Sequence, residues 1–140
     1  MKTLSNLYFL LIHADGNVSE NEITRGKQMM HAEGIDEGQF NRLSDSLKQK
    51  NRLEIYQDCV TGLRKLDTKS QIRSIAWLCV IANADGFMAK EEWMLIYKIY
   101  QTELNLKLDD IMKVQKDLNR TIHGKAFHSL GVKMDTKTIL

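Results

Sequence analysis

Four acidic residues in two short stretches have the types and spacing that could bind a metal ion. Asp15 and Glu22 lie seven residues apart in "HADGNVSENE", and Asp85 and Glu92 lie seven apart in "NADGFMAKEE". A glycine follows each aspartate, which is typical of a sharp turn. Carboxylate oxygens are the ligands that hard divalent cations prefer. The sequence therefore predicts two acidic turns that bind a divalent ion, with Ca²⁺, Mg²⁺, Mn²⁺ and Zn²⁺ all open.

The spacing matches the second half of an EF-hand calcium loop and departs from the first half. If Asp15 stands at loop position 5, Gly16 falls at position 6 and Glu22 at position 12. Position 1 must supply an oxygen ligand, but it is Leu11 in the first stretch and Ile81 in the second. We therefore expect no complete EF-hand, and any ion at these turns would keep several waters.

A structural role explains the same residues. An aspartate just before a helix can accept backbone N–H groups, and the downstream glutamate can close a capping box. Val18 and Met88 would then bury the turns in the core. Under this alternative the protein is a protein–protein interaction scaffold with purely structural turns. Replacing Asp15 or Asp85 with Asn separates the two: it abolishes ion binding in the first case and costs about 1 kcal/mol of stability in the second.

Helices must position these turns. Proline is absent, and helix-start signals recur along the chain. Ser19–Glu22 and Thr68–Gln71 have the spacing of capping boxes, Asp36 can cap the next helix, and Gly34 can end one. Seven helices are predicted, over residues 3–14, 19–33, 36–48, 52–66, 68–84, 89–103 and 108–122. Residues 123–140 are predicted to form a C-terminal tail, either loose or strand-like.

The two stretches belong to an internal duplication. His13–Ile23 aligns with Asn83–Trp93 at a constant offset of 70 residues. An apolar helix precedes the turn in each copy, and a helix that is apolar on every face must lie at the centre of a bundle. We therefore expect an all-α fold, a single-domain pseudo-twofold helical bundle over residues 1–122 with repeat copies around 4–33 and 74–103.

The stretches "ADGNVSENEI" and "ADGFMAKEEW", each after an apolar helix, resemble the tellurite-resistance TerB family across roughly residues 4–120. The same domain occurs near the N-terminus of membrane-anchored J-domain co-chaperones of the DjlA type. The resemblance implies an all-α, duplicated domain whose acidic surface positions bind metal ions. The positions that carry over are Asp15, Glu22, Asp85 and Glu92.

The resemblance also implies a bacterial stress-response role, with links to metal sensing and membrane-associated complexes and no established enzymatic activity. This sequence departs from the family pattern in two places. Lys90 stands where the first copy has Glu20, so the two turns differ in charge. The His-Pro-Asp motif of a J-domain is absent, because the chain has no proline.

Composition and the remaining motifs narrow the function further. The formal net charge of +2 is too small for a nucleic-acid-binding surface. No apolar run is long enough to span a membrane, and no secretory signal is visible. Cys59 and Cys79 lie in apolar stretches, as expected for buried free thiols in a reducing cytoplasm.

Enzymatic chemistry finds no support in the sequence. It contains neither a Ser/His/Asp arrangement nor a glycine-rich phosphate loop. His13 could join Asp15 in binding a transition metal, but a local hydrogen bond at the end of a helix is the favoured role. We therefore expect a cytoplasmic, non-enzymatic stress-response module that acts with a protein partner.

Overall fold

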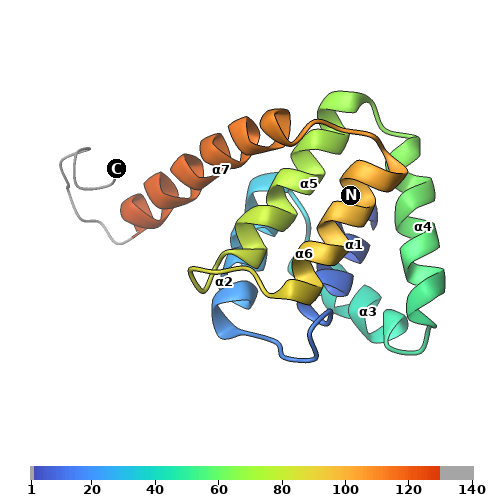
Figure 1. The fold of residues 1–140 in the computed structure, drawn as a ribbon. Coiled ribbons are helices and arrows are strands. Elements are labelled where there is room, and N and C mark those ends of the chain that lie inside the picture. The colour runs from blue at the N-terminus through green and yellow to red at the C-terminus, as the bar shows by residue number, and fades with distance from the viewer. Residues whose placement is uncertain (1, 130–140) are drawn as a thin grey trace.

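The computed structural model describes residues 2–129, and the side chains of residues 2–123. All regular structure in this part of the chain is helical, which confirms the predicted all-α fold (Figure 1). The α-helices are α1 (Lys2–Ile12), α2 (Glu20–Glu33), α3 (Glu37–Leu47), α4 (Arg52–Arg64), α5 (Thr68–Ala82), α6 (Lys90–Tyr97) and α7 (Leu108–Ser129). A π-helical segment, η1 (Lys98–Glu103), continues α6 directly.

Local capping groups set several helix ends where the sequence predicts them. Ser19 is the N-cap of α2 and forms the predicted capping box with Glu22. Asp36 caps α3 by accepting the backbone N–H of Gln39 at 2.8 Å. Gly34 ends α2 with φ at 69°, in the left-handed region that favours glycine. These signals act within one helical turn, so they can be seen in the sequence.

One predicted cap and one predicted helix end are wrong. Helix α5 begins at Thr68 as predicted, but its cap is Asp67, whose carboxylate accepts the backbone N–H of Ser70 at 2.8 Å. The last helix continues to Ser129 instead of ending at residue 122. No proline interrupts it, so helical hydrogen bonding can continue through Ser129. Residues 130–140 of the predicted tail lie outside the described residues.

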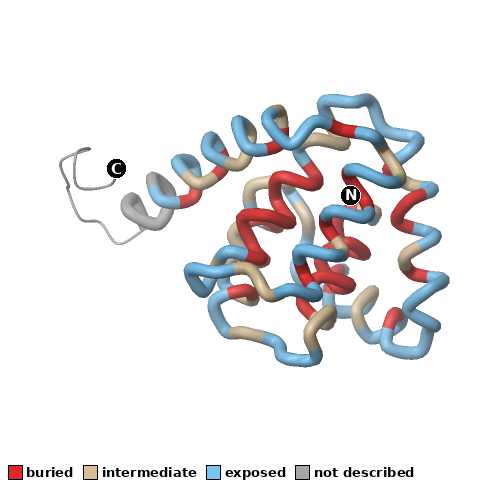
Figure 2. Tube along the Cα trace, in the orientation of Figure 1, coloured by how far each residue is buried: buried red, intermediate tan, exposed pale blue. Residues whose placement is uncertain are grey.

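The two apolar helices α1 and α5 form the centre of the molecule, as predicted (Figure 2). They pack on each other, α4 covers α1, and α7 covers α5. Trp77 on α5 is fully buried in this core. The hydrophobic effect of this continuous apolar centre is what holds the outer helices in place.

The two copies of the duplicated unit are interlocked. Helix α2 of the first copy packs on α5 of the second, and α6 of the second copy contacts α1 of the first. The N-terminus of α2 therefore lies beside that of α6. The side-chain amide of Asn21 donates a hydrogen bond to Asp85 Oδ1 at 2.6 Å, which joins the two turns directly.

Both cysteines are free and buried, as predicted. Burial raises the pKa of the Cys59 and Cys79 thiols to about 12. A thiol with so high a pKa is almost entirely protonated at neutral pH, and the thiolate is the reactive form. These two residues therefore contribute apolar packing to the core and no reactive thiolate.

Candidate functional site

The first acidic turn connects α1 to α2. Gly16 has φ at 80°, and Asp15 Oδ1 accepts the backbone N–H of Asn17 at 2.9 Å, so the aspartate stabilises its own turn. Ser19 Oγ accepts the N–H of Glu22, and Glu22 Oε1 accepts the N–H of Ser19, both at 3.4 Å. This reciprocal capping fixes the Glu22 side chain at the start of α2.

The second acidic turn, between α5 and α6, repeats the glycine turn and the position of the glutamate but differs in its cap and in the partner of its aspartate. Gly86 has φ at 87°, and Glu92 Oε1 accepts the backbone N–H of Ala89 at 3.1 Å. Ala89 occupies the position equivalent to Ser19 but has no side-chain acceptor for the helix N–H groups. Glu92 therefore takes the same position at the start of α6 that Glu22 takes at the start of α2. Only the glutamate half of the capping box is present in α6.

The structure brings Glu22 and Glu92 together. Their carboxyl groups lie close enough for a shared proton to join them in a hydrogen bond, and each residue is only 3% exposed. Glu92 Oε2 is buried and has no hydrogen-bond donor, so the Glu22 carboxyl is the group with which it can share a proton. The sequence predicted two separate pockets, whereas the fold joins the glutamates of both copies in one carboxyl pair.

Burial is the main influence on Glu22. Together with hydrogen bonding to Glu92 and the charge of that carboxyl group, it raises the pKa of Glu22 to about 8. The backbone N–H of Ser19 acts in the opposite direction, and the charge of Asp15 adds a smaller upward effect. Near neutral pH, Glu22 therefore tends to hold a proton, and a cation close to the pair would favour its release.

The two aspartates stand outside the carboxyl pair. Asp15 is half-buried and bonded within its own turn, and Asp85 is exposed and held by Asn21. Neither is the N-cap of the following helix, since Ser19 and Ala89 hold those positions. Within residues 2–123, no group of three or more His, Cys, Asp or Glu side chains converges in a way that could hold a metal ion.

Other side chains near the turns differ from expectation. Val18 is 46% exposed, so the prediction that it is buried in the core is wrong, whereas Met88 is partly buried and packs against the core. The ring of His13 packs at a tilt against Phe9, with ring centroids 4.5 Å apart. Burial and the charges of Arg52 and Lys48 lower the pKa of His13. This contact is local to the end of α1, but it is a ring contact, so the predicted local hydrogen bond of His13 stays a prediction.

Contacts that the sequence analysis missed hold α2 against α5. Glu33 Oε1 accepts the indole N–H of Trp77 at 2.6 Å and forms an ion pair with Arg73 Nε, also at 2.6 Å. Asn21 was missed for the same reason: its partner Asp85 is 64 residues away, and no local pattern links the two. These contacts fix both ends of α2 and hence the direction of Glu22.

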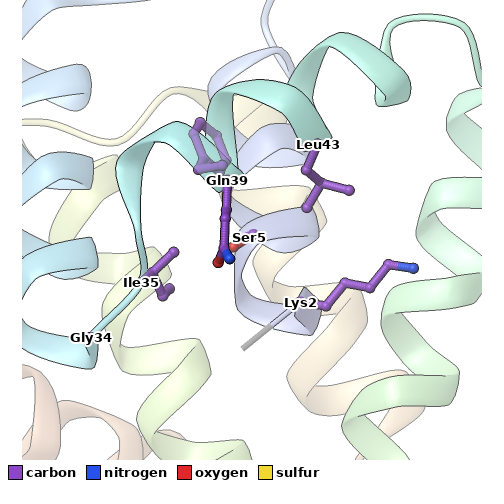
Figure 3. Close-up of a pocket in the computed structure, with 7 residues that line it drawn as sticks. Lys2, Ser5, Gly34, Ile35, Gln39 and Leu43 are labelled. Carbon is purple, nitrogen blue, oxygen red and sulfur yellow. The ribbon is translucent and has the colours of Figure 1, made fainter.

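A separate hollow of about 380 Å³ lies between the start of α1 and α3 (Figure 3). In this view the side chain of Gln39 points toward Ser5, and Lys2, Ile35 and Leu43 surround them. No carboxylate is among its lining residues. The hollow therefore does not contribute to the predicted metal chemistry.

Comparisons with known proteins give one match. The family model described as tellurite resistance protein TerB matches residues 3–116, a range that contains both acidic turns. Comparisons with curated proteins and with solved structures gave no match. None of the helices within residues 2–129 is long and apolar enough to cross a membrane.

Proposed function

This chain belongs to the tellurite resistance protein TerB family. From that membership and from the paired glutamates, we propose that the protein is a non-enzymatic stress-response module. We propose that it binds one divalent cation between its two acidic turns. The observation that carries the proposal is the buried Glu22–Glu92 pair. A cytoplasmic location and a protein partner are part of the same proposal, and both follow from the family resemblance.

The electrostatics of the pair favour a bound cation. Two buried carboxylates repel each other unless a proton or a cation lies between them. One oxygen of each glutamate is held by a backbone N–H, while Glu92 Oε2 lacks a donor. The charge of Asp15 acts on Glu22, and Asp85 is joined to the neighbouring residue Asn21. A cation would replace the proton and relieve this repulsion.

The ligand types favour Ca²⁺, Mg²⁺ or Mn²⁺ over Zn²⁺. Carboxylate oxygens suit hard cations, whereas Zn²⁺ is usually bound by His and Cys side chains. His13 lies against Phe9, and both cysteines are buried in the core. With two carboxylates as inner ligands and the aspartates farther out, the ion would keep several waters. Such a site is expected to be weak, with a Kd on the order of 0.1–1 mM.

An NMR amide titration of metal-stripped protein with each of the four ions tests the proposal. One ion per chain should produce saturable shifts that appear together on both turns and fit a single Kd. Glu92→Gln should weaken binding at least about tenfold and reduce the response of both turns, because it removes a ligand charge from the shared site. Glu91→Gln is the matched control, since this exposed neighbour carries the same charge.

Three outcomes would contradict the proposal. Spectra that do not move at millimolar ion would leave the turns as structural elements of an interaction scaffold. Independent responses of the two turns would indicate two sites instead of one. Equal effects of Glu91→Gln and Glu92→Gln would indicate a general attraction of cations to the acidic surface. Asp15→Asn and Asp85→Asn should weaken binding less than Glu92→Gln, because neither aspartate is part of the buried pair.

A further inference from the structure

A second cavity, of about 270 Å³, lies between α2 and α3 over the surface of α1. We call it the α2–α3 groove. Its apolar lining includes Tyr8 and Ile12 from α1, Met30 from α2 and Phe40 from α3, which are all buried. Neither glutamate of the carboxyl pair lines it. The groove is therefore separate from the candidate cation site, although the first acidic turn forms one of its ends.

The charged and titratable groups of the groove lie at its ends and are mainly basic. Lys48 and His13 line one end, and the charges of Lys48 and Arg52 both act on the His13 ring. At the other end Lys27 Nζ is 3.6 Å from Glu37 Oε1, so the single carboxylate in the lining is already paired. The His13 end is thus an apolar cleft that opens onto positive charge.

Lys48 has one competing partner. Its ammonium group lies 3.5 Å from Asp45, but the two side chains are 60% and 78% exposed. Ion pairs as exposed as this contribute little and exchange readily with solvent. Lys48 is therefore free to turn toward an anion in the groove.

We propose that the α2–α3 groove binds a small amphipathic carboxylate, with its apolar tail against Val18, Ile23 and Phe40 and its carboxylate between His13 and Lys48. The volume limits the size of the ligand. At about 30 Å³ for each water-sized group, 270 Å³ holds about nine such groups, which corresponds to a medium-chain fatty acid or a substituted benzoate. Apolar walls with a few polar groups at one end are typical of small-molecule sites.

Octanoate is the probe, and NMR amide titration of the full chain is the measurement. We expect saturable shifts at Val18, Ile23, Asn41 and Ser44, which line the groove. Octanol has the same tail without the charge and should bind about two- to fivefold more weakly, as expected for losing one partly exposed charge interaction. Octylammonium, with the opposite charge, should bind more weakly still.

Two variants with a matched control connect the response to the groove. Lys48→Gln should weaken octanoate about two- to fivefold and leave octanol unchanged. Ser44→Phe should fill the groove and abolish the response to both ligands. Ser46→Phe adds the same ring at an exposed position of α3 that does not line the groove, so it should bind octanoate normally.

The proposal would be overturned if octanoate produced no saturable shift up to about 10 mM, a limit that already corresponds to very weak binding. Octylammonium binding as tightly as octanoate would overturn it too, and so would shifts that persist in Ser44→Phe. The test is independent of the cation proposal, because octanoate is titrated into metal-stripped protein and Glu92→Gln should bind it as the parent does.

Discussion

At the scale of single residues, the burial of Glu22 beside Glu92 determines how stability depends on pH. The pKa of Glu22 is about 8 in the folded chain against an ordinary value of 4.5. Between these values the folded state keeps a proton that the unfolded state has lost. The free energy of unfolding of metal-free protein should therefore fall as pH rises through this window and level off above it, by roughly 1–3 kcal/mol in total.

Urea unfolding followed by circular dichroism, from about pH 5 to 8.5, measures this dependence above the range in which ordinary carboxylates titrate. His13 acts in the opposite direction: its lowered pKa makes stability rise with pH up to its unfolded value near 6.5. The comparison is therefore made with Glu22→Gln, which keeps His13. The parent should lose more stability than this variant as pH rises, and parallel curves would show that Glu22 does not carry a buried proton.

At the scale of helices, the duplicated starts of α2 and α6 differ in one capping group. Ser19 and Ala89 have similar extended backbones, with ψ at 141° and 150°, but only Ser19 has a hydroxyl to accept N–H groups. Ser19→Ala should lower the free energy of unfolding by about 1 kcal/mol, and Ala89→Ser should raise it by about 0.5–1 kcal/mol. Chemical denaturation of the two variants measures both changes, and no gain from Ala89→Ser would mean that α6 starts without needing a cap.

The same contrast between local and distant interactions explains what could be predicted from the sequence. With α6 and η1 taken as one continuous helix, six of the seven predicted helices end within a few residues of their observed bounds, because caps and apolar periodicity act over one or two turns. The duplication also predicted correctly that α1 and α5 are central. The meeting of Glu22 with Glu92 could not be predicted, since it depends on α2 and α6 each packing across the opposite copy. The exposure of Val18 likewise depends on how the turn lies against its neighbours.

At the scale of the whole molecule, packing is uneven. Helix α1 is buried continuously from Leu4 to Ile12 and α5 from Ser74 to Ala82, whereas Phe40 and Leu47 are the buried residues of α3. The Phe40 ring lies against Tyr8 with centroids 5.3 Å apart, and both hollows of the N-terminal half border it. Helix α3 is therefore attached to the bundle by a small contact area with cavities on either side.

This packing predicts that α3 opens before the rest of the molecule unfolds. Local opening exposes little apolar surface when few side chains are buried, so its free-energy cost is small. In native-state hydrogen exchange, amides of α3 should exchange with a lower free energy and a weaker denaturant dependence than those of α5, which should exchange only by global unfolding. Octanoate in the α2–α3 groove should raise the protection of α3 selectively, because it binds the closed form alone. Equal protection of α3 and α5 would show that Phe40 and Leu47 are enough to join α3 to the cooperative core.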